Sequence, residues 1–185
     1  MLTHLKRFKH PFSDDRLLWE KIDAYNIDDA DSSFKFSHRL ARENLWTTEY
    51  TDRVIEEYKK FVFLGCVDGP VTPSLDVDQC WHLHMIYTED YWKGFCKILN
   101  TEFHHGPTKG GKVETNKYID IYQKTKDAYR DYFGEPPHDI WPISSVRFRP
   151  VNFAFIDLND HWVIPVGDTK SLLSLLIKQI KRKLW

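Results

Sequence analysis

The segment from Ser74 to Leu99 constrains the fold of this chain more than any other part. Its apolar residues lie almost all round a helix: Leu75, Val77, Trp81, Leu83, Met85, Ile86, Trp92, Phe95 and Ile98. A helix that is apolar on nearly every side has to be covered by other elements. We therefore expect a central buried helix here, about 37 Å long if unbroken, at the usual rise per residue. Ser74 is its expected N-cap.

Four further segments place apolar residues at helical spacing and can cover this helix. The clearest runs from Thr48 to Cys66, and a turn-rich stretch from Asp68 to Pro73 ends it. The other three helices are predicted at residues 13–25, 37–44 and 114–133. The sequence therefore predicts a mainly α protein with a helical-bundle domain over residues 12–142.

A different pattern begins after Pro142. Residues 146–149, 151–156 and 162–166 favour short strands, and Asn159-Asp160 supplies a turn between the last two. Residues 168–185 form an amphipathic pattern with five basic residues and one acidic residue. We expect residues 143–185 to form a small β-hairpin followed by a basic terminal helix.

Charge and composition exclude some classes of protein. The 26 basic and 27 acidic residues argue against a nucleic-acid binder. No apolar run has the length of a signal peptide or a membrane span, and three scattered cysteines do not suggest a disulfide framework. We expect a cytoplasmic protein whose partners are unknown. Its basic tail, residues 168–185, is a candidate for contact with a protein or with an anionic membrane surface.

Four of the nine histidines fall within 24 positions, at 82, 84, 104 and 105. Imidazole is both a common metal ligand and a common acid or base near neutral pH. Asp78 and His82 are four residues apart, so they share a helix face and can reach one ion. Since adjacent side chains diverge, we expect one residue of the pair His104/His105 to join them. The predicted metal ligands are Asp78, His82 and His105, with zinc as the favoured divalent transition metal.

The role of His84 stays open. It lies about 200° around an ideal helix from His82, so both can face one ion only if the helix is distorted. His84 and His104 are candidate catalytic residues, either as a further ligand or as a proton shuttle. A thiol–imidazole pair of Cys80 with His84 is an alternative, although nothing in the sequence orients the base. Each histidine taken alone also fits a hydrogen-bonded core or surface residue.

The glycine-rich loop from Gly106 to Lys112 matches the spacing of a nucleotide-binding P-loop. However, Val113 stands where such a loop has Ser or Thr, and a helix precedes it instead of a strand. We therefore do not expect a nucleotide site. Lys109 and Lys112, placed before the next helix, are candidates for a simpler anion site, and a plain connector is the other interpretation.

Several strings together resemble a known domain over residues 36–142. They are Arg39-Leu-Ala-Arg-Glu-Asn44, Trp81-His-Leu-His84, His104-His-Gly-Pro-Thr-Lys-Gly-Gly111 and Tyr132-Phe-Gly-Glu135. The resemblance is to an uncharacterised bacterial helical domain. Through the Asp-x-x-Trp-His-x-His element at residues 78–84, the chain is also distantly similar to the helical domain of plant glycine-rich-domain proteins. This implies a mainly helical fold with a histidine-bearing central helix, and it implies no established activity.

Two functional hypotheses follow. In the first, the chain is a metal-dependent enzyme of hydrolytic type, in which the ion activates water and Lys109 steers an anionic substrate. In the second, it is a non-catalytic interaction module whose His/Asp cluster is a structural metal site or a polar network in the core.

Overall fold

The computed structural model describes residues 14–106, 110–150, 156–157 and 159–161. The chain divides into two units between Arg149 and Pro150, and each is considered by itself. The described part is mainly helical and contains no strand, which confirms the predicted mainly α class. Among the described residues, every helix is too short or too polar to cross a membrane.

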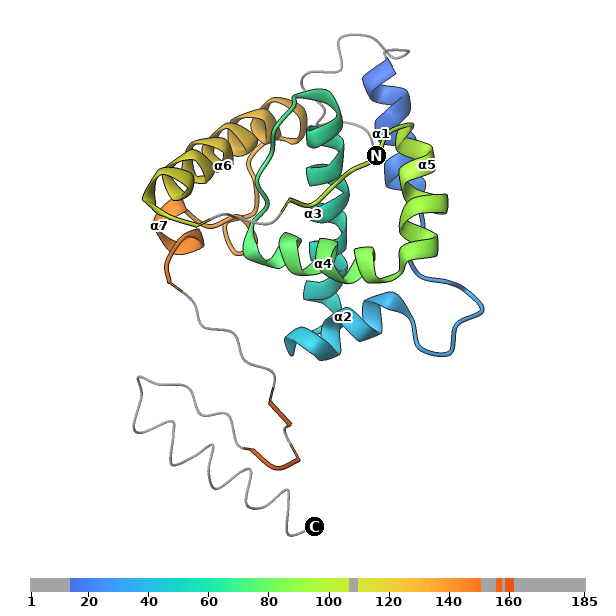
Figure 1. The fold of residues 1–185 in the computed structure, drawn as a ribbon. Helices are drawn as coiled ribbons and strands as arrows, with labels where there is room; N and C mark the ends of the chain where they lie inside the picture. The colour runs from blue at the N-terminus through green and yellow to red at the C-terminus, as the bar shows by residue number, and fades with distance from the viewer. Residues whose placement is uncertain (1–13, 107–109, 151–155, 158, 162–185) are drawn as a thin grey trace. The chain divides into compact units, whose positions relative to one another are not determined.

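The centre of the first unit is α3, which spans Thr48–Val67, one residue beyond the predicted end, and has Thr47 as its N-cap. Six of its apolar side chains are fully buried: Val54, Tyr58, Phe61, Val62, Phe63 and Leu64. It packs against α1 (Asp14–Ala24), α2 (Phe36–Asn44), α4 (Leu75–Ile86) and α6 (Lys112–Phe133) (Figure 1). The expectation that residues 74–99 form the central helix was therefore wrong, because α3 occupies that place.

The single helix expected over residues 74–99 is divided. Its first part, α4, begins as predicted, with the Ser74 hydroxyl accepting a hydrogen bond from the backbone N–H of Val77. It ends at Ile86. The chain then forms a π-helix, η1 (Asp90–Phe95), and a last short turn, α5 (Cys96–Leu99).

Buried polar side chains explain this break. His84 Nε2 lies 2.8 Å from a carboxylate oxygen of Asp90, and the Tyr25 hydroxyl donates to the same carboxylate at 2.6 Å. Residues six apart on a straight helix point about 120° away from each other, so this contact requires a bend. The indole of Trp81 also reaches the hydroxyl of Tyr91, ten residues further on, at 2.8 Å. These contacts bend the chain after Ile86, although its apolar pattern favoured one straight helix.

The first strand of the expected hairpin, residues 146–149, is not present. The chain forms a short helix there, α7 (Ser144–Arg147). Arg147 donates from Nε to the carbonyl of Pro73 at 2.8 Å, and the ring of Phe148 packs edge-on against Tyr122. Two neighbouring side chains thus both contact other segments of the first unit, which the alternating pattern of a strand does not allow.

The rest of the expected hairpin lies almost wholly outside the described residues, as does the terminal helix at 168–185. Within the described part of the second unit, the backbone N–H of Asp160 donates to the carbonyl of Asp157 at 3.2 Å. The predicted turn at Asn159-Asp160 is confirmed.

A buried carboxylate on α3 ties α6 and the segment after it to the centre. Glu57 is 4% exposed. Its two oxygens accept hydrogen bonds from Trp141 Nε1 at 2.8 Å, from the Tyr129 hydroxyl at 3.0 Å and from Lys60 Nζ at 2.7 Å. A buried charge is tolerated when it is paired and hydrogen-bonded in this way.

We predict that Glu57→Ala lowers the free energy of unfolding by about 2–3 kcal/mol, because it leaves two buried donors without an acceptor. Glu56→Ala is the matched control, since Glu56 is exposed and adjacent, and it should change stability by less than about 0.5 kcal/mol. Urea denaturation of the two variants makes the comparison. Equal stability of the two would contradict the role given to Glu57.

Candidate metal centre

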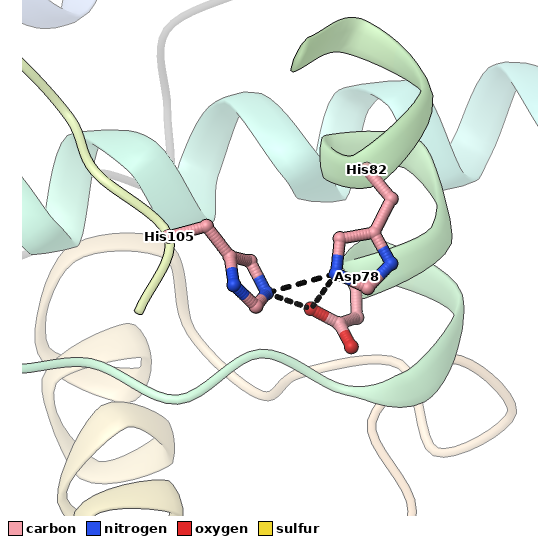
Figure 2. A group of neighbouring side chains, drawn as sticks. All are labelled: Asp78, His82 and His105. Carbon is pink, nitrogen blue, oxygen red and sulfur yellow. Dashed lines mark hydrogen bonds and ion pairs between the residues drawn. The ribbon is translucent and has the colours of Figure 1, made fainter. Parts of the chain in front are cut away.

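Three predicted ligands meet at one point of the structure. Asp78 and His82 stand one turn apart on α4, and His105 reaches them from the loop that follows α5 (Figure 2). His105 Nε2 lies 3.0 Å from Asp78 Oδ1 and 3.0 Å from His82 Nε2. His82 Nε2 lies 3.8 Å from Asp78 Oδ1. The i,i+4 spacing on a helix thus places two of the three groups, as the sequence predicts.

These distances suit a metal ion. Ligands about 2.1 Å from a tetrahedral zinc ion stand about 3.4 Å from one another, and the observed separations lie on either side of that value. The side chains of Asp78 and His105 are 17% and 25% exposed, while that of His82 is 45% exposed. The cluster is therefore half-buried and open to solvent on one side. Among the described residues, these three are the only such group.

Aromatic packing holds the loop that carries His105. The ring of Phe103 packs against Phe61 and Trp81, at centroid distances of 5.8 and 4.8 Å. The ring of His105 itself lies 4.6 Å from that of Trp81. Tyr91 donates its hydroxyl hydrogen to the backbone carbonyl of Phe103, so the loop is fixed from both sides.

Gly65 makes this packing feasible. A Cβ atom at that position of α3 would lie 2.5 Å from the ring of Phe103. Because Gly65 has no side chain, the ring of Phe103 can lie directly on the backbone of α3. This contact also positions the loop that carries Phe103 and His105.

His84 has a different environment from His82. It is fully buried, its Nδ1 lies 2.9 Å from the Tyr58 hydroxyl, and its Nε2 lies 2.8 Å from Asp90. Burial acts to raise the pKa of Asp90, but hydrogen bonds from His84 and Tyr25 outweigh it and hold that pKa below its ordinary value. Both ring nitrogens of His84 therefore have partners in the core, on another face of α4 from the metal cluster.

The proposed pair of Cys80 with His84 does not form, because Tyr58 and Asp90 occupy both imidazole nitrogens. Cys80 is also fully buried, and burial raises the pKa of its thiol well above the ordinary value. A reactive cysteine needs the opposite shift, toward the thiolate.

His104 does not belong to the group of three ligands. Its Nε2 lies 2.8 Å from a carboxylate oxygen of Glu102, its side chain is 66% exposed, and its ring packs on Trp92. Of the two candidate anion-binding lysines, Lys112 opens α6 and is exposed, while Lys109 lies outside the described residues. The structure therefore brings Asp78, His82 and His105 together and leaves His84, His104 and Lys112 outside this group.

A cleft of about 390 Å³ opens beside Asp78 and His105. Its other walls come from five segments: Val71–Pro73, Trp81 of α4, His104 and Gly106 of the loop after α5, Thr115 and Tyr118 of α6, and Arg147 with Phe148. Arg147 is half-buried, and burial lowers the pKa of its guanidinium although the nearby carboxylate of Asp78 opposes that change. The sequence pattern did not predict Arg147 at this cleft, since residues 146–149 were expected in a strand.

The comparisons with known proteins find one weak similarity. The chain is 21% identical over 105 residues to "Glycine-rich domain-containing protein 1" of Arabidopsis thaliana. The aligned region covers 54% of this chain and 13% of the plant protein. This match agrees with the distant similarity to plant glycine-rich-domain proteins noted in the sequence. No protein-family model matches the chain, and no solved structure matches it. The activity of the domain has to be inferred from its own site.

We predict that Tyr91→Phe destabilises the protein by about 1–3 kcal/mol, because it leaves the buried Trp81 indole N–H without an acceptor and releases the loop at Phe103. Tyr118→Phe is the control, since no hydrogen bond of its hydroxyl is found among the described residues. Thermal unfolding of both variants measures the difference. An unchanged melting temperature of Tyr91→Phe would show that this hydroxyl does not hold the loop.

Proposed function

We propose that this domain is a metal-dependent hydrolase whose ion, zinc by preference, is held by Asp78, His82 and His105. The observation that carries the proposal is the convergence of three ligand atoms, all within 4.8 Å of one another, from a helix and a separate loop. Two of the ligands, Asp78 and His105, line a cleft large enough for a small substrate.

The kind and number of ligands support a catalytic site over a structural one. Structural zinc sites are closed by four protein ligands, often cysteines, whereas catalytic sites use three ligands and keep one position for water. Here two imidazoles and one carboxylate come together, and Cys80 and Cys96 are buried elsewhere in the core. A divalent ion in this place would lower the pKa of a bound water and polarise the bond to be cleaved.

The side chains around the cluster have separable tasks in this proposal. The Trp81 ring supports the imidazole of His105 and shields one side of the cluster. His104 lines the same cleft, and its hydrogen bond to Glu102 orients the ring. We assign it the transfer of a proton between solvent and substrate. His84, with both nitrogens bound in the core, has no part in the chemistry.

A non-catalytic module is the second candidate, and one observation favours it. The hydrogen bond of 3.0 Å between His105 and Asp78 already satisfies both groups without an ion. The cluster would then be a polar contact that fixes the loop to α4, and the cleft would bind a partner without turnover.

We predict that the wild-type protein binds one zinc ion per chain and that His82→Ala combined with His105→Ala weakens this affinity by at least about 100-fold. Removal of ligands should exceed the 10- to 100-fold effect typical of residues around them. The helical circular dichroism should persist, because neither side chain belongs to the core. His138→Ala, at an exposed turn, is the control. Equal zinc content in the double variant and the wild type would end the assignment.

Turnover separates the two candidate functions. Under the first, zinc-loaded protein cleaves members of a panel of activated esters, amides and phosphate esters, and a chelator stops the reaction reversibly. The double variant is inactive, and His104→Ala keeps the zinc but slows the reaction. Stoichiometric zinc with no turnover on any member of the panel would favour the module.

A further inference from the structure

The cleft beside the candidate metal centre contains a cation with unused hydrogen-bond donors. Arg147 donates from Nε to the carbonyl of Pro73 at 2.8 Å, and its guanidinium lies 5.1 Å from the centre of the Phe148 ring. These contacts fix the plane of the guanidinium. Among the described residues, no acceptor or carboxylate pairs with Nη1 or Nη2.

Four other arginines of the described part are paired with carboxylates. Each of the following forms an ion pair with a carboxylate: Arg16 with Glu20, Arg39 with Glu43, Arg53 with Asp139, and Arg130 with Asp127 and Glu135. These pairs lie at the surface, where water could replace either partner. Arg147 is half-buried at the wall of a cleft, where a charge without a partner costs more. Its free edge is suited to a planar or tetrahedral oxyanion.

Thr72, a residue that lines the same cleft, carries a second unpaired group. The hydroxyl of Thr72 is buried and has no hydrogen-bond partner among the described residues, while the whole residue is only 5% exposed. The backbone N–H of Thr72 donates a hydrogen bond to the hydroxyl of Thr125 at 3.1 Å. Among the described residues, only the side-chain hydroxyl of Thr72 is therefore without a partner. Thr72 precedes Pro73, whose carbonyl holds Arg147. A buried polar group without a partner is rare and asks for an explanation such as a ligand.

The charges of the cleft change when an ion is bound. Asp78 is close enough to influence Arg147 electrostatically, but its Oδ1 is engaged by His105. A divalent ion at the cluster would outweigh the single negative charge of Asp78. The cleft would then carry a positive charge at each end, from the ion and from Arg147, with aromatic walls from Trp81, Tyr118 and Phe148 between them.

We infer that Arg147 and Thr72 form an oxyanion subsite and that the substrate is a small molecule carrying a carboxylate or phosphate group. The substrate's oxyanion binds the free edge of Arg147, its apolar body lies along the aromatic walls, and the bond to be cleaved faces Asp78, His82 and His105. The role as a substrate subsite rests on the proposed function, while the binding of the anion itself can be tested separately. A cleft of about 390 Å³ suits a single small molecule.

Titration calorimetry with three probes that share one ring tests the subsite: phenyl phosphate, benzoate and neutral benzyl alcohol. We expect zinc-loaded protein to bind one or both anions, to bind benzyl alcohol at least 10-fold more weakly, and to bind the anions more tightly than zinc-free protein does. The stronger of the two anions identifies the substrate group as phosphate or carboxylate. Equal binding of all three probes would overturn the inference, as would no binding of either anion.

Variants of the subsite give the decisive comparison. Arg147→Met should weaken anion binding at least 10-fold and leave zinc affinity within about 2-fold. Arg149→Met, an exposed neighbour, should match the wild type in both. Thr72→Val should weaken the anion about 3- to 10-fold without loss of stability, since it removes an unpaired hydroxyl. Should Arg147→Met fail to fold, Arg147→Lys keeps the charge without the planar fork, and wild-type anion affinity in it would overturn the bidentate contact.

The two proposals fail in different ways. If the protein does not bind zinc but still binds an anion through Arg147, the metal-dependent activity is wrong and the subsite stands. If zinc binds as predicted but Arg147→Met binds the anions as well as Arg149→Met does, the subsite is wrong and the metal centre stands.

Discussion

The contact between the buried ring of His84 and the carboxylate of Asp90 turns the chain where its apolar pattern would have continued straight. Because of this turn, the residues after α5 run back along α4 instead of away from it (Figure 1). Phe103 can then pack on Trp81, and the loop brings His105 to the face that carries Asp78 and His82. A histidine that takes no part in the metal cluster therefore decides whether the cluster can assemble.

The two histidines of the Trp-His-x-His element have different roles: His82 belongs to the candidate metal site, and His84 is part of the buried core. Positions two apart on a helix point in nearly opposite directions, so His82 faces solvent while His84 enters the core. Four aromatic rings surround His84, those of Phe36, Tyr58, Tyr91 and Phe95. A polar side chain buried this deeply specifies one arrangement of its neighbours, because any other arrangement leaves it unpaired.

Local rules were enough to predict α3, the Ser74 cap and the pairing of Asp78 with His82, because each depends on spacing along one helix. His105 lies in the group with Asp78 and His82, whereas the divergence of adjacent side chains predicted only that one of His104 and His105 would join it. The break after Ile86, the helix at α7 and the position of Arg147 were missed. Each depends on a contact between segments far apart in sequence, such as Arg147 with Pro73, and no periodicity records such contacts.

The three candidate ligands come from two segments, and Asp78 and His105 are 27 residues apart. An ion that joins them would act as a reversible cross-link, comparable to a disulfide that closes a loop of that length. It would also bind the folded chain and not the unfolded one, so the occupied fraction would add directly to stability. The folded population of such a domain would then report the free concentration of the metal around it.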